Sequence, residues 1–259
     1  WASRTLLARA LKGLQDVVPV TIVEPFLTDQ GWRFGDYPGA TRDPVLGAEY
    51  VHQLYTAADR KFTGRATVPV LWDTEKATIV SNESADIVRM LNSAFDGLPG
   101  IEKGLDLYPE SRRAEIDAIN DEMYDALNNG VYKSGFAKSQ EAYEEAVGGV
   151  FAQLNTMEQR MSDGREFLLG DTLTESDLRL FVTLIRFDAA YHGLFKCNIK
   201  QLTDYPHLVG YVKRMMRVPG VKGTVNMTHI KTGYYSIKAL NPSQIVPVGP
   251  DESWLSVEE

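Results

Sequence analysis

Two short pairs of residues, Val68-Pro69 and Glu83-Ser84, have the residue types needed to bind an amino acid or a small peptide. Proline removes a donor from a strand ladder, so Pro69 predicts an edge strand or a turn, and Val68-Pro69 is a candidate cis peptide. A cis bond would turn the N–H and C=O groups of Val68 outward, where an extended peptide can pair with them as an added strand. At a helix N-terminus, we expect Ser84 to cap the helix, the free N–H groups to attract a carboxylate, and Glu83 to accept from an ammonium group. Val68, Glu83 and Ser84 together predict an amino-acid clamp.

The clamp requires strands and helices that bring these two pairs together. Periodicity and turn residues predict a helix at 4–14 and a strand at 20–23, followed by a long insertion at 28–65 that contains a helix at 50–61. Two strands, at 67–72 and 78–80, and a helix at 84–94 come after the insertion. This order is that of a thioredoxin-like α/β fold whose first strand is absent from the chain. We therefore assign residues 1–97 to a thioredoxin-like domain.

Residues 98–109 lose the periodicity and contain proline and glycine, so they predict a linker. An all-helical domain follows over 110–240, and residues 241–259 predict an extended tail without regular structure. We expect helices in this domain at 110–129, 139–161, 174–191 and 205–216. The expected breaks between them include Gly130, Gly164 and Gly170. Thr174 and Asp177 have the spacing of a capping box in front of a buried helix, which is a structural role.

Composition excludes several classes of function. The chain has 259 residues, 44% of them hydrophobic, and a net charge of −8, so nucleic acid and anionic membranes are disfavoured as partners. It contains no apolar run of about 18 residues, and its beginning lacks the pattern of a signal peptide, so we expect a cytoplasmic protein. Its single cysteine, Cys197, excludes an internal disulfide, and its four histidines show no ligand spacing, so we expect no metal.

Several longer motifs, in order along the chain, resemble one family. The chain resembles the glutathionyl-hydroquinone reductases, the Xi class of glutathione transferases. The motifs are WASRT at 1–5, TVPVLWD at 67–73, SNES at 81–84, NNGVYKSGFA at 128–137, RFD at 186–188, Tyr234, NP at 241–242 and IVPVGP at 245–250.

The resemblance implies a reductive removal of glutathione from glutathionyl-hydroquinones, with glutathione as co-substrate and no metal. A cysteine thiolate attacks the sulfur of the conjugate, the hydroquinone leaves, and a second glutathione resolves the mixed disulfide to give glutathione disulfide. In the family this cysteine belongs to a Cys-Pro-Trp-Ala motif, and Trp1 corresponds to the tryptophan of that motif. We therefore expect the nucleophile to precede Trp1, at the N-terminus of the first helix, where a thiolate is favoured. No residue of this chain is assigned as catalytic.

The resemblance also assigns binding residues. Tyr132 and Tyr234 correspond to the hydroxyl groups on the hydroquinone side, although Tyr235 is an equal candidate from the sequence alone. Trp32 corresponds to an aromatic residue that contacts glutathione. Val68, Pro69, Glu83 and Ser84 are further expected glutathione contacts. Arg65 can pair with the glycine carboxylate of glutathione, because guanidinium binds carboxylates in a bidentate manner. Cys197 is expected to be a buried, inert thiol.

Three alternatives remain open at this point. A glutathione transferase scaffold without its thiol could only bind glutathione or aromatic ligands, and a glutathione lyase acting on aryl ethers would use the same site. A transferase that activates glutathione through a hydroxyl, with Ser3 as the nearest candidate, is disfavoured because Ser3 lies inside the first helix. The resemblance further implies a homodimer formed through the helical domain.

Overall fold

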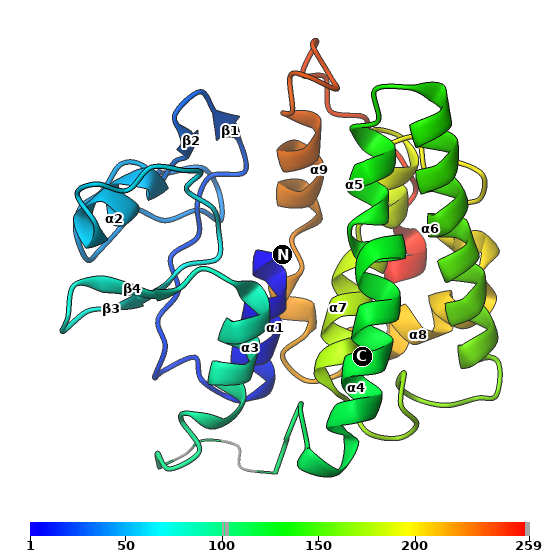
Figure 1. Ribbon diagram of the computed structural model, residues 1–259, viewed down its shortest axis with the longest axis horizontal. Helices are drawn as coiled ribbons and strands as arrows, with labels where there is room; N and C mark the ends of the chain where they lie inside the picture. Colours follow the sequence, from blue (N-terminus) through cyan, green and yellow to red (C-terminus); the bar gives the residue numbers. More distant parts are fainter. Residues whose placement is uncertain (100, 102–103, 257–259) are drawn as a thin grey trace. The chain divides into compact units, whose positions relative to one another are not determined.

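The computed structural model describes residues 1–99, 101 and 104–256 (Figure 1). The chain divides into two compact units, 1–103 and 104–259, and the division falls inside the predicted linker 98–109. Linker residues 100, 102 and 103 and tail residues 257–259 lie outside the described part. Each unit is described separately.

The first unit contains small sheets and helices. Its elements are α1 (Ala2–Leu11), β1 (Leu27–Thr28), β2 (Gly31–Trp32), α2 (Val51–Ala58), β3 (Leu71–Asp73), β4 (Thr78–Ser81) and α3 (Ser84–Ser93). The strands form two antiparallel pairs, β1 with β2 and β3 with β4, and α1 packs against α3. The predicted first helix, the helix inside the insertion, the second strand of the pair and the helix after it are all confirmed.

Two predictions for strands were wrong in part. Residues 20–23 form no strand, because their backbone bonds go to the insertion: the N–H of Ile22 donates to Oγ1 of Thr41 and its carbonyl accepts from the N–H of Thr41. The strand predicted at 67–72 begins only at Leu71, and its register with β4 shifts between Leu71 and Trp72. The cis peptide predicted at Val68-Pro69 is present.

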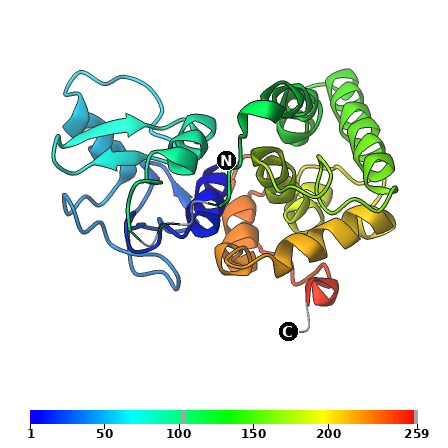
Figure 2. The ribbon, with the colours of Figure 1, turned by 90° about the horizontal axis from the view of Figure 1, so that it is seen from below.

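The second unit is helical. Its α-helices are α4 (Arg113–Met123), α5 (Gly130–Gly135), α6 (Gln140–Met161), α7 (Glu175–Leu184), α8 (Pro206–Arg217) and α9 (Met227–Tyr235). Its π-helical turns are Tyr124–Asn128 and Phe187–His192. Its short 3-10 turns are Glu110–Arg112, Leu202–Asp204, Lys222–Thr224 and Ser253–Leu255. Every residue of α7 except Arg179 is buried, and Figure 2 shows the other helices of this unit around it.

The predicted helices 139–161 and 205–216 correspond to α6 and α8, whereas the α-helical parts of 110–129 and 174–191 are shorter than predicted and are each followed by a π-helical turn. Gly130 does not break the chain of helices but opens α5, where it lets α5 approach α6: a Cβ added at Gly130 would lie 3.0 Å from Cγ2 of Val150. α9 was not predicted. Gly164 and Gly170 lie between α6 and α7 with positive φ, as expected of breaks.

The predicted capping box of α7 is confirmed. Oδ2 of Asp177 accepts from the N–H and the hydroxyl of Thr174, at 2.9 and 3.1 Å, and Oδ1 accepts from the N–H of Leu168 and the hydroxyl of Tyr211, at 2.9 and 3.2 Å. Burial raises the pKa of Asp177 to about 6, although these hydrogen bonds act to lower it.

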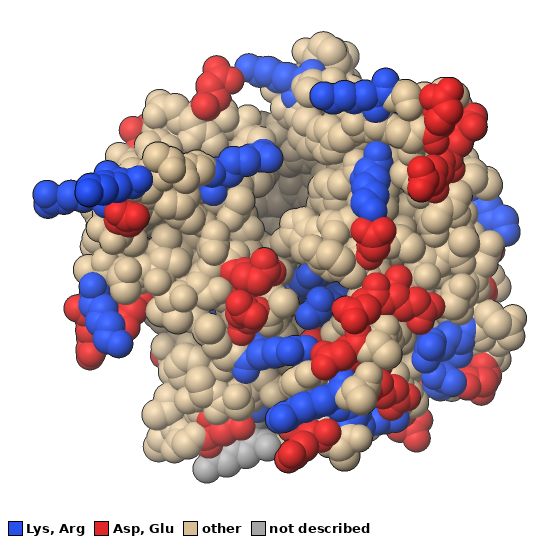
Figure 3. All heavy atoms as spheres, viewed as in Figure 1, with Lys and Arg blue, Asp and Glu red and all other residues tan. Residues whose placement is uncertain are grey.

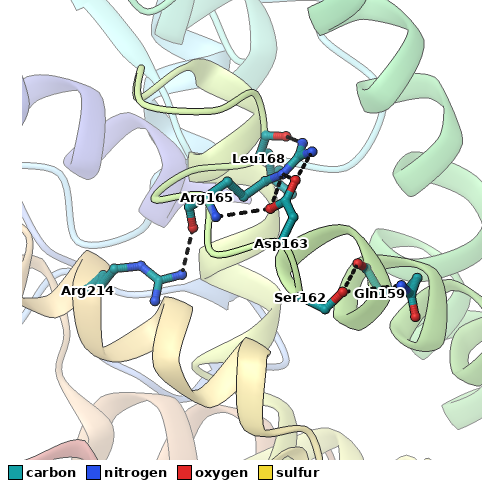
Figure 4. Close-up of polar contacts among 6 residues, drawn as sticks. All are labelled: Gln159, Ser162, Asp163, Arg165, Leu168 and Arg214. Carbon is teal, nitrogen blue, oxygen red and sulfur yellow. Dashed lines mark hydrogen bonds and ion pairs between the residues drawn. The ribbon is translucent and has the colours of Figure 1, made fainter.

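Charged contacts hold the loop that leads into this box (Figure 4). Arg165 pairs with Asp163 at 2.7 Å and donates to the carbonyl of Leu168 at 2.9 Å, while Arg214 donates to the carbonyl of Arg165. Hydrogen bonds from Arg165 lower the pKa of Asp163 to about 2. The loop thereby fixes the N–H of Leu168 that Asp177 accepts.

Charges of both signs are interspersed over the face of the molecule that Figure 3 shows. Among the described helices, none is both long enough and apolar enough to cross a membrane.

Candidate functional site

The backbone of Val68 is open for pairing. Val68 follows the insertion and precedes the cis bond to Pro69, and its side chain packs against a core cluster that contains Phe34 and Tyr55. No hydrogen bond joins the N–H or C=O of Val68 to another described residue. Both groups are therefore available to an extended peptide, as an edge strand would offer them.

The second half of the clamp lies at the start of α3. The helix begins at Ser84 and its N-cap is Glu83, whose Oε1 accepts from the N–H of Ala85 at 3.3 Å. The prediction that Ser84 caps the helix was wrong, because the carboxylate of Glu83 already reaches the free amide there. Ser84 is 2% exposed, and its hydroxyl donates to Oε1 of Glu83 at 3.4 Å. This end of α3 thus combines a carboxylate, a hydroxyl and free helix N–H groups.

Trp32 and Arg65 have different surroundings. Trp32 lies on β2 and is half-buried against the same core cluster as Val68. Arg65 is exposed, and no described residue forms a hydrogen bond or an ion pair with it. Their contacts with a ligand remain predictions.

In the second unit, three tyrosines from separate elements meet through their hydroxyl groups. Tyr132 lies on α5, Tyr234 on α9 and Tyr191 on the π-helical turn Phe187–His192. The hydroxyl oxygen of Tyr234 lies 2.7 Å from that of Tyr132 and 2.7 Å from that of Tyr191. We call Tyr132, Tyr191 and Tyr234 the tyrosine cluster.

The tyrosine cluster is suited to donating hydrogen bonds. Each of the three hydroxyl groups can both donate and accept a hydrogen bond. Burial raises the pKa of both Tyr191 and Tyr234 well above the ordinary value for tyrosine. Both therefore stay protonated at neutral pH, as donors must. Such a group can hold a phenolic oxygen of an aromatic ligand.

The cluster includes one residue that the sequence did not indicate and excludes another that it left open. Tyr191 was expected only as the end of a helix, and no motif or spacing marked its hydroxyl. Tyr235, adjacent to Tyr234, points elsewhere: a Cβ added at Gly193 would lie 2.8 Å from its hydroxyl oxygen. Phe195 was also missed, although its ring lies 5.4 Å from that of Tyr132, between centroids, and 5.6 Å from that of Tyr234.

The one cysteine of the chain is ill suited to be a nucleophile. Cys197 is fully buried, and burial raises the pKa of its thiol to about 11. Within the described residues, no group of three or more His, Cys, Asp or Glu side chains could hold a metal ion.

Comparisons with protein families give one result for both units. The family model "Glutathione S-transferase, N-terminal domain" matches residues 1–94, and "Glutathione S-transferase, C-terminal domain" matches residues 140–214.

Individual relatives are similar over nearly the whole chain. The glutathionyl-hydroquinone reductase PcpF of Sphingobium chlorophenolicum is 49% identical over 96% of this chain and 79% of its own length. The glutathionyl-hydroquinone reductase YqjG of Escherichia coli is 48% identical over 100% of this chain and 78% of its own.

Solved structures agree with these relatives. The glutathione-bound structure of YqjG has a TM-score of 0.95 at 47% identity, covering 99% of this chain and 83% of that one. The Xi glutathione transferase of Phanerochaete chrysosporium has a TM-score of 0.94 at 48% identity, covering 97% and 87%.

Proposed function

The chain belongs to the glutathione S-transferase family and, within it, to the Xi class, and on that premise we propose that it is a glutathionyl-hydroquinone reductase. The observation that carries this proposal is the tyrosine cluster, whose hydroxyl groups suit an aromatic ring with phenolic oxygens. The amino-acid clamp would hold the glutathionyl part of the glutathionyl-hydroquinone conjugate.

The clamp fits the groups that glutathione presents. Its cysteinyl backbone can pair with the N–H and C=O of Val68 as an added strand. Its γ-glutamyl carboxylate can accept from the Ser84 hydroxyl and the N–H groups at the start of α3, and its ammonium can donate to Glu83. Trp32, Pro69 and Arg65 are proposed as further contacts.

The reaction replaces a carbon–sulfur bond by a carbon–hydrogen bond. A cysteine thiolate, proposed to precede Trp1, attacks the glutathionyl sulfur, the ring carbon takes a proton, and the hydroquinone leaves. Tyr132 and Tyr234 hold the phenolic oxygens while charge develops on the ring. A second glutathione thiolate then attacks the mixed disulfide, giving glutathione disulfide and the free enzyme thiolate. In the net reaction, one glutathione thiol and the thioether sulfur of the conjugate become the two sulfurs of the disulfide, while the ring carbon exchanges its bond to sulfur for a bond to hydrogen.

The test is product analysis with glutathionyl-hydroquinone and excess glutathione. We expect hydroquinone and glutathione disulfide in a ratio of one to one. The Cys197→Ser variant should keep this turnover, because that thiol is buried and its pKa is about 11. Binding of the conjugate without products would instead support the ligand-binding scaffold.

An aryl ether offered with glutathione distinguishes the lyase. Release of a phenol together with a glutathione thioether, and no glutathione disulfide, would identify lyase chemistry. The homodimer and the cytoplasmic location, which the family resemblance and the composition suggest, are proposed with the function. Sedimentation velocity measures the first directly.

A further inference from the structure

The two halves of the amino-acid clamp come from separate loops, and one hydroxyl group joins those loops. Tyr55 lies on α2, is 4% exposed, and donates its hydroxyl hydrogen to the carbonyl oxygen of Thr67 at 2.8 Å. The same hydroxyl oxygen accepts from the N–H of Thr67 at 3.2 Å and from Nδ2 of Asn82 at 3.1 Å. A tyrosine hydroxyl has one hydrogen and two acceptor positions, so its capacity is fully used.

The bonded residues directly precede the two halves of the clamp. Thr67 has both of its backbone groups held by Tyr55, as a neighbouring strand would hold them, whereas the next residue, Val68, has both of its groups open. Asn82 precedes the N-cap Glu83 and also donates from Nδ2 to Oγ1 of Thr67 at 3.3 Å. The segment before Val68 and the segment before Glu83 are therefore tied together at one oxygen atom.

The position of that oxygen is itself fixed. The ring of Tyr55 lies in the core cluster of the first unit, with its centroid 4.8 Å from that of Phe62. Trp32 and Val68 pack against the same cluster. A buried ring has few rotamers open to it, so its hydroxyl stays where α2 and the core hold it.

We propose that Tyr55 is a positioning residue: through Thr67 and Asn82, its hydroxyl sets the spacing between Val68 and Glu83 and thereby the affinity for glutathione. The inference rests on the proposed function, since it takes glutathione as the ligand of the clamp. A purely structural role for Tyr55 predicts a loss of stability without a specific loss of affinity.

The first variant is Tyr55→Phe, which keeps the ring and removes the hydroxyl. We expect the Kd for glutathione, measured by calorimetry, to rise roughly tenfold, the effect of one lost buried hydrogen-bonding group. KM for glutathione should rise likewise, while kcat at saturating glutathione stays unchanged. The matched control is Tyr205→Phe in the second unit: Tyr205 is 2% exposed, and its hydroxyl donates to Oδ1 of Asn155 at 3.2 Å. It should lower the melting temperature without changing the Kd.

Asn82→Ala supplies an independent test, because Asn82 is exposed and its loss should not prevent folding. We expect a rise in Kd of about threefold, and the double variant should bind no more than about tenfold more weakly than wild type, since both changes act on one hydroxyl.

Three results would overturn the role of Tyr55: a Kd for Tyr55→Phe within twofold of wild type, an equal loss in Tyr205→Phe, or full additivity in the double variant. A wild-type protein that binds no glutathione would overturn the proposed function as well.

Discussion

At the scale of single residues, hydroxyl groups contribute to both the amino-acid clamp and the tyrosine cluster. Tyr234 shares hydrogen bonds with Tyr132 and Tyr191, and Ser84 donates to Glu83. A hydroxyl both donates and accepts, so each of these groups can exchange a protein partner for a ligand without leaving a buried polar atom unpaired.

Tyr234 is the central hydroxyl of the cluster, so its loss should affect the aromatic side of the reaction most. Tyr234→Phe should lower turnover of glutathionyl-hydroquinone about a hundredfold, because a donor to the developing charge is lost. The Kd for glutathione should not change. Tyr235→Phe is the control, and steady-state kinetics should find it within twofold of wild type. Equal losses in the two variants would mean that the hydroxyl contacts of Tyr234 are not what the reaction uses.

The sequence predicted single residues where a local pattern determines their surroundings. The cis bond at Val68-Pro69 and the box of Thr174 and Asp177 follow from properties of neighbouring residues, and both are present. Tyr191 could not be found this way, because its partner Tyr234 lies 43 positions away in the chain. Only the packing of α9 against the π-helical turn Phe187–His192 brings the two together.

At the scale of elements, the errors occur where contacts between elements overrule local preference. A glycine such as Gly130 predicts a helix break, yet Gly130 begins α5. The residue there is small because α6 lies so close that an added Cβ would crowd Val150. The β-branched residues at 20–23 predict a strand, but the backbone groups of Ile22 bond to Thr41 in the insertion. Neither outcome is encoded within a window of a few residues.

The packing of α5 leads to a prediction at Gly135, its last residue. A Cβ added there would lie 2.4 Å from Cγ of Phe195, whose ring packs on all three tyrosines of the cluster. Gly135→Ala should therefore displace Phe195, lower the free energy of unfolding by about 1–3 kcal/mol and reduce turnover.

The control is Gly149→Ala within α6, where an added Cβ meets nothing within 4 Å. It should raise the unfolding free energy by about 0.5–1 kcal/mol, as alanine does in place of glycine in a helix. Urea unfolding and the reductase assay measure both effects. If Gly135→Ala were as stable and active as wild type, Phe195 would not be needed to support the cluster.

The buried capping box of α7 predicts a dependence of stability on pH. The pKa of Asp177 is raised by burial to about 6 in the folded chain, against about 3.9 when unfolded. The folded state thus binds more protons between these values, so the contribution is present below about pH 4 and lost as the pH rises through about 6.

Comparison with Asp177→Asn isolates this group, because asparagine does not titrate. The stability advantage of the wild type over this variant should shrink by about 2–3 kcal/mol between pH 4 and pH 7. Urea unfolding at both pH values measures it. An advantage that grew with pH would instead show that the four hydrogen bonds keep the carboxylate ionised.

At the scale of the whole molecule, the two units supply different chemistry. The first unit offers open backbone groups, a carboxylate and a helix N-terminus, which suit a charged peptide, and the second offers buried hydroxyl groups among aromatic rings. The sequence predicted the boundary between the two units, because the proline- and glycine-containing segment 98–109 separates strand and turn patterns from helical periodicity.

This division predicts that substitutions in the two units act independently. Ser84→Ala should raise KM for the conjugate about tenfold, because the peptide carboxylate loses a donor, with little change in kcat. Tyr234→Phe should lower kcat about a hundredfold with little change in KM. Since each acts on a different part of the substrate, the double variant should lose about a thousandfold in kcat/KM, within about twofold of the product of the single losses. A double variant no worse than Tyr234→Phe alone would mean that the clamp and the cluster act as one unit, and that the hydroxyl of Ser84 contributes only when the ring is already held.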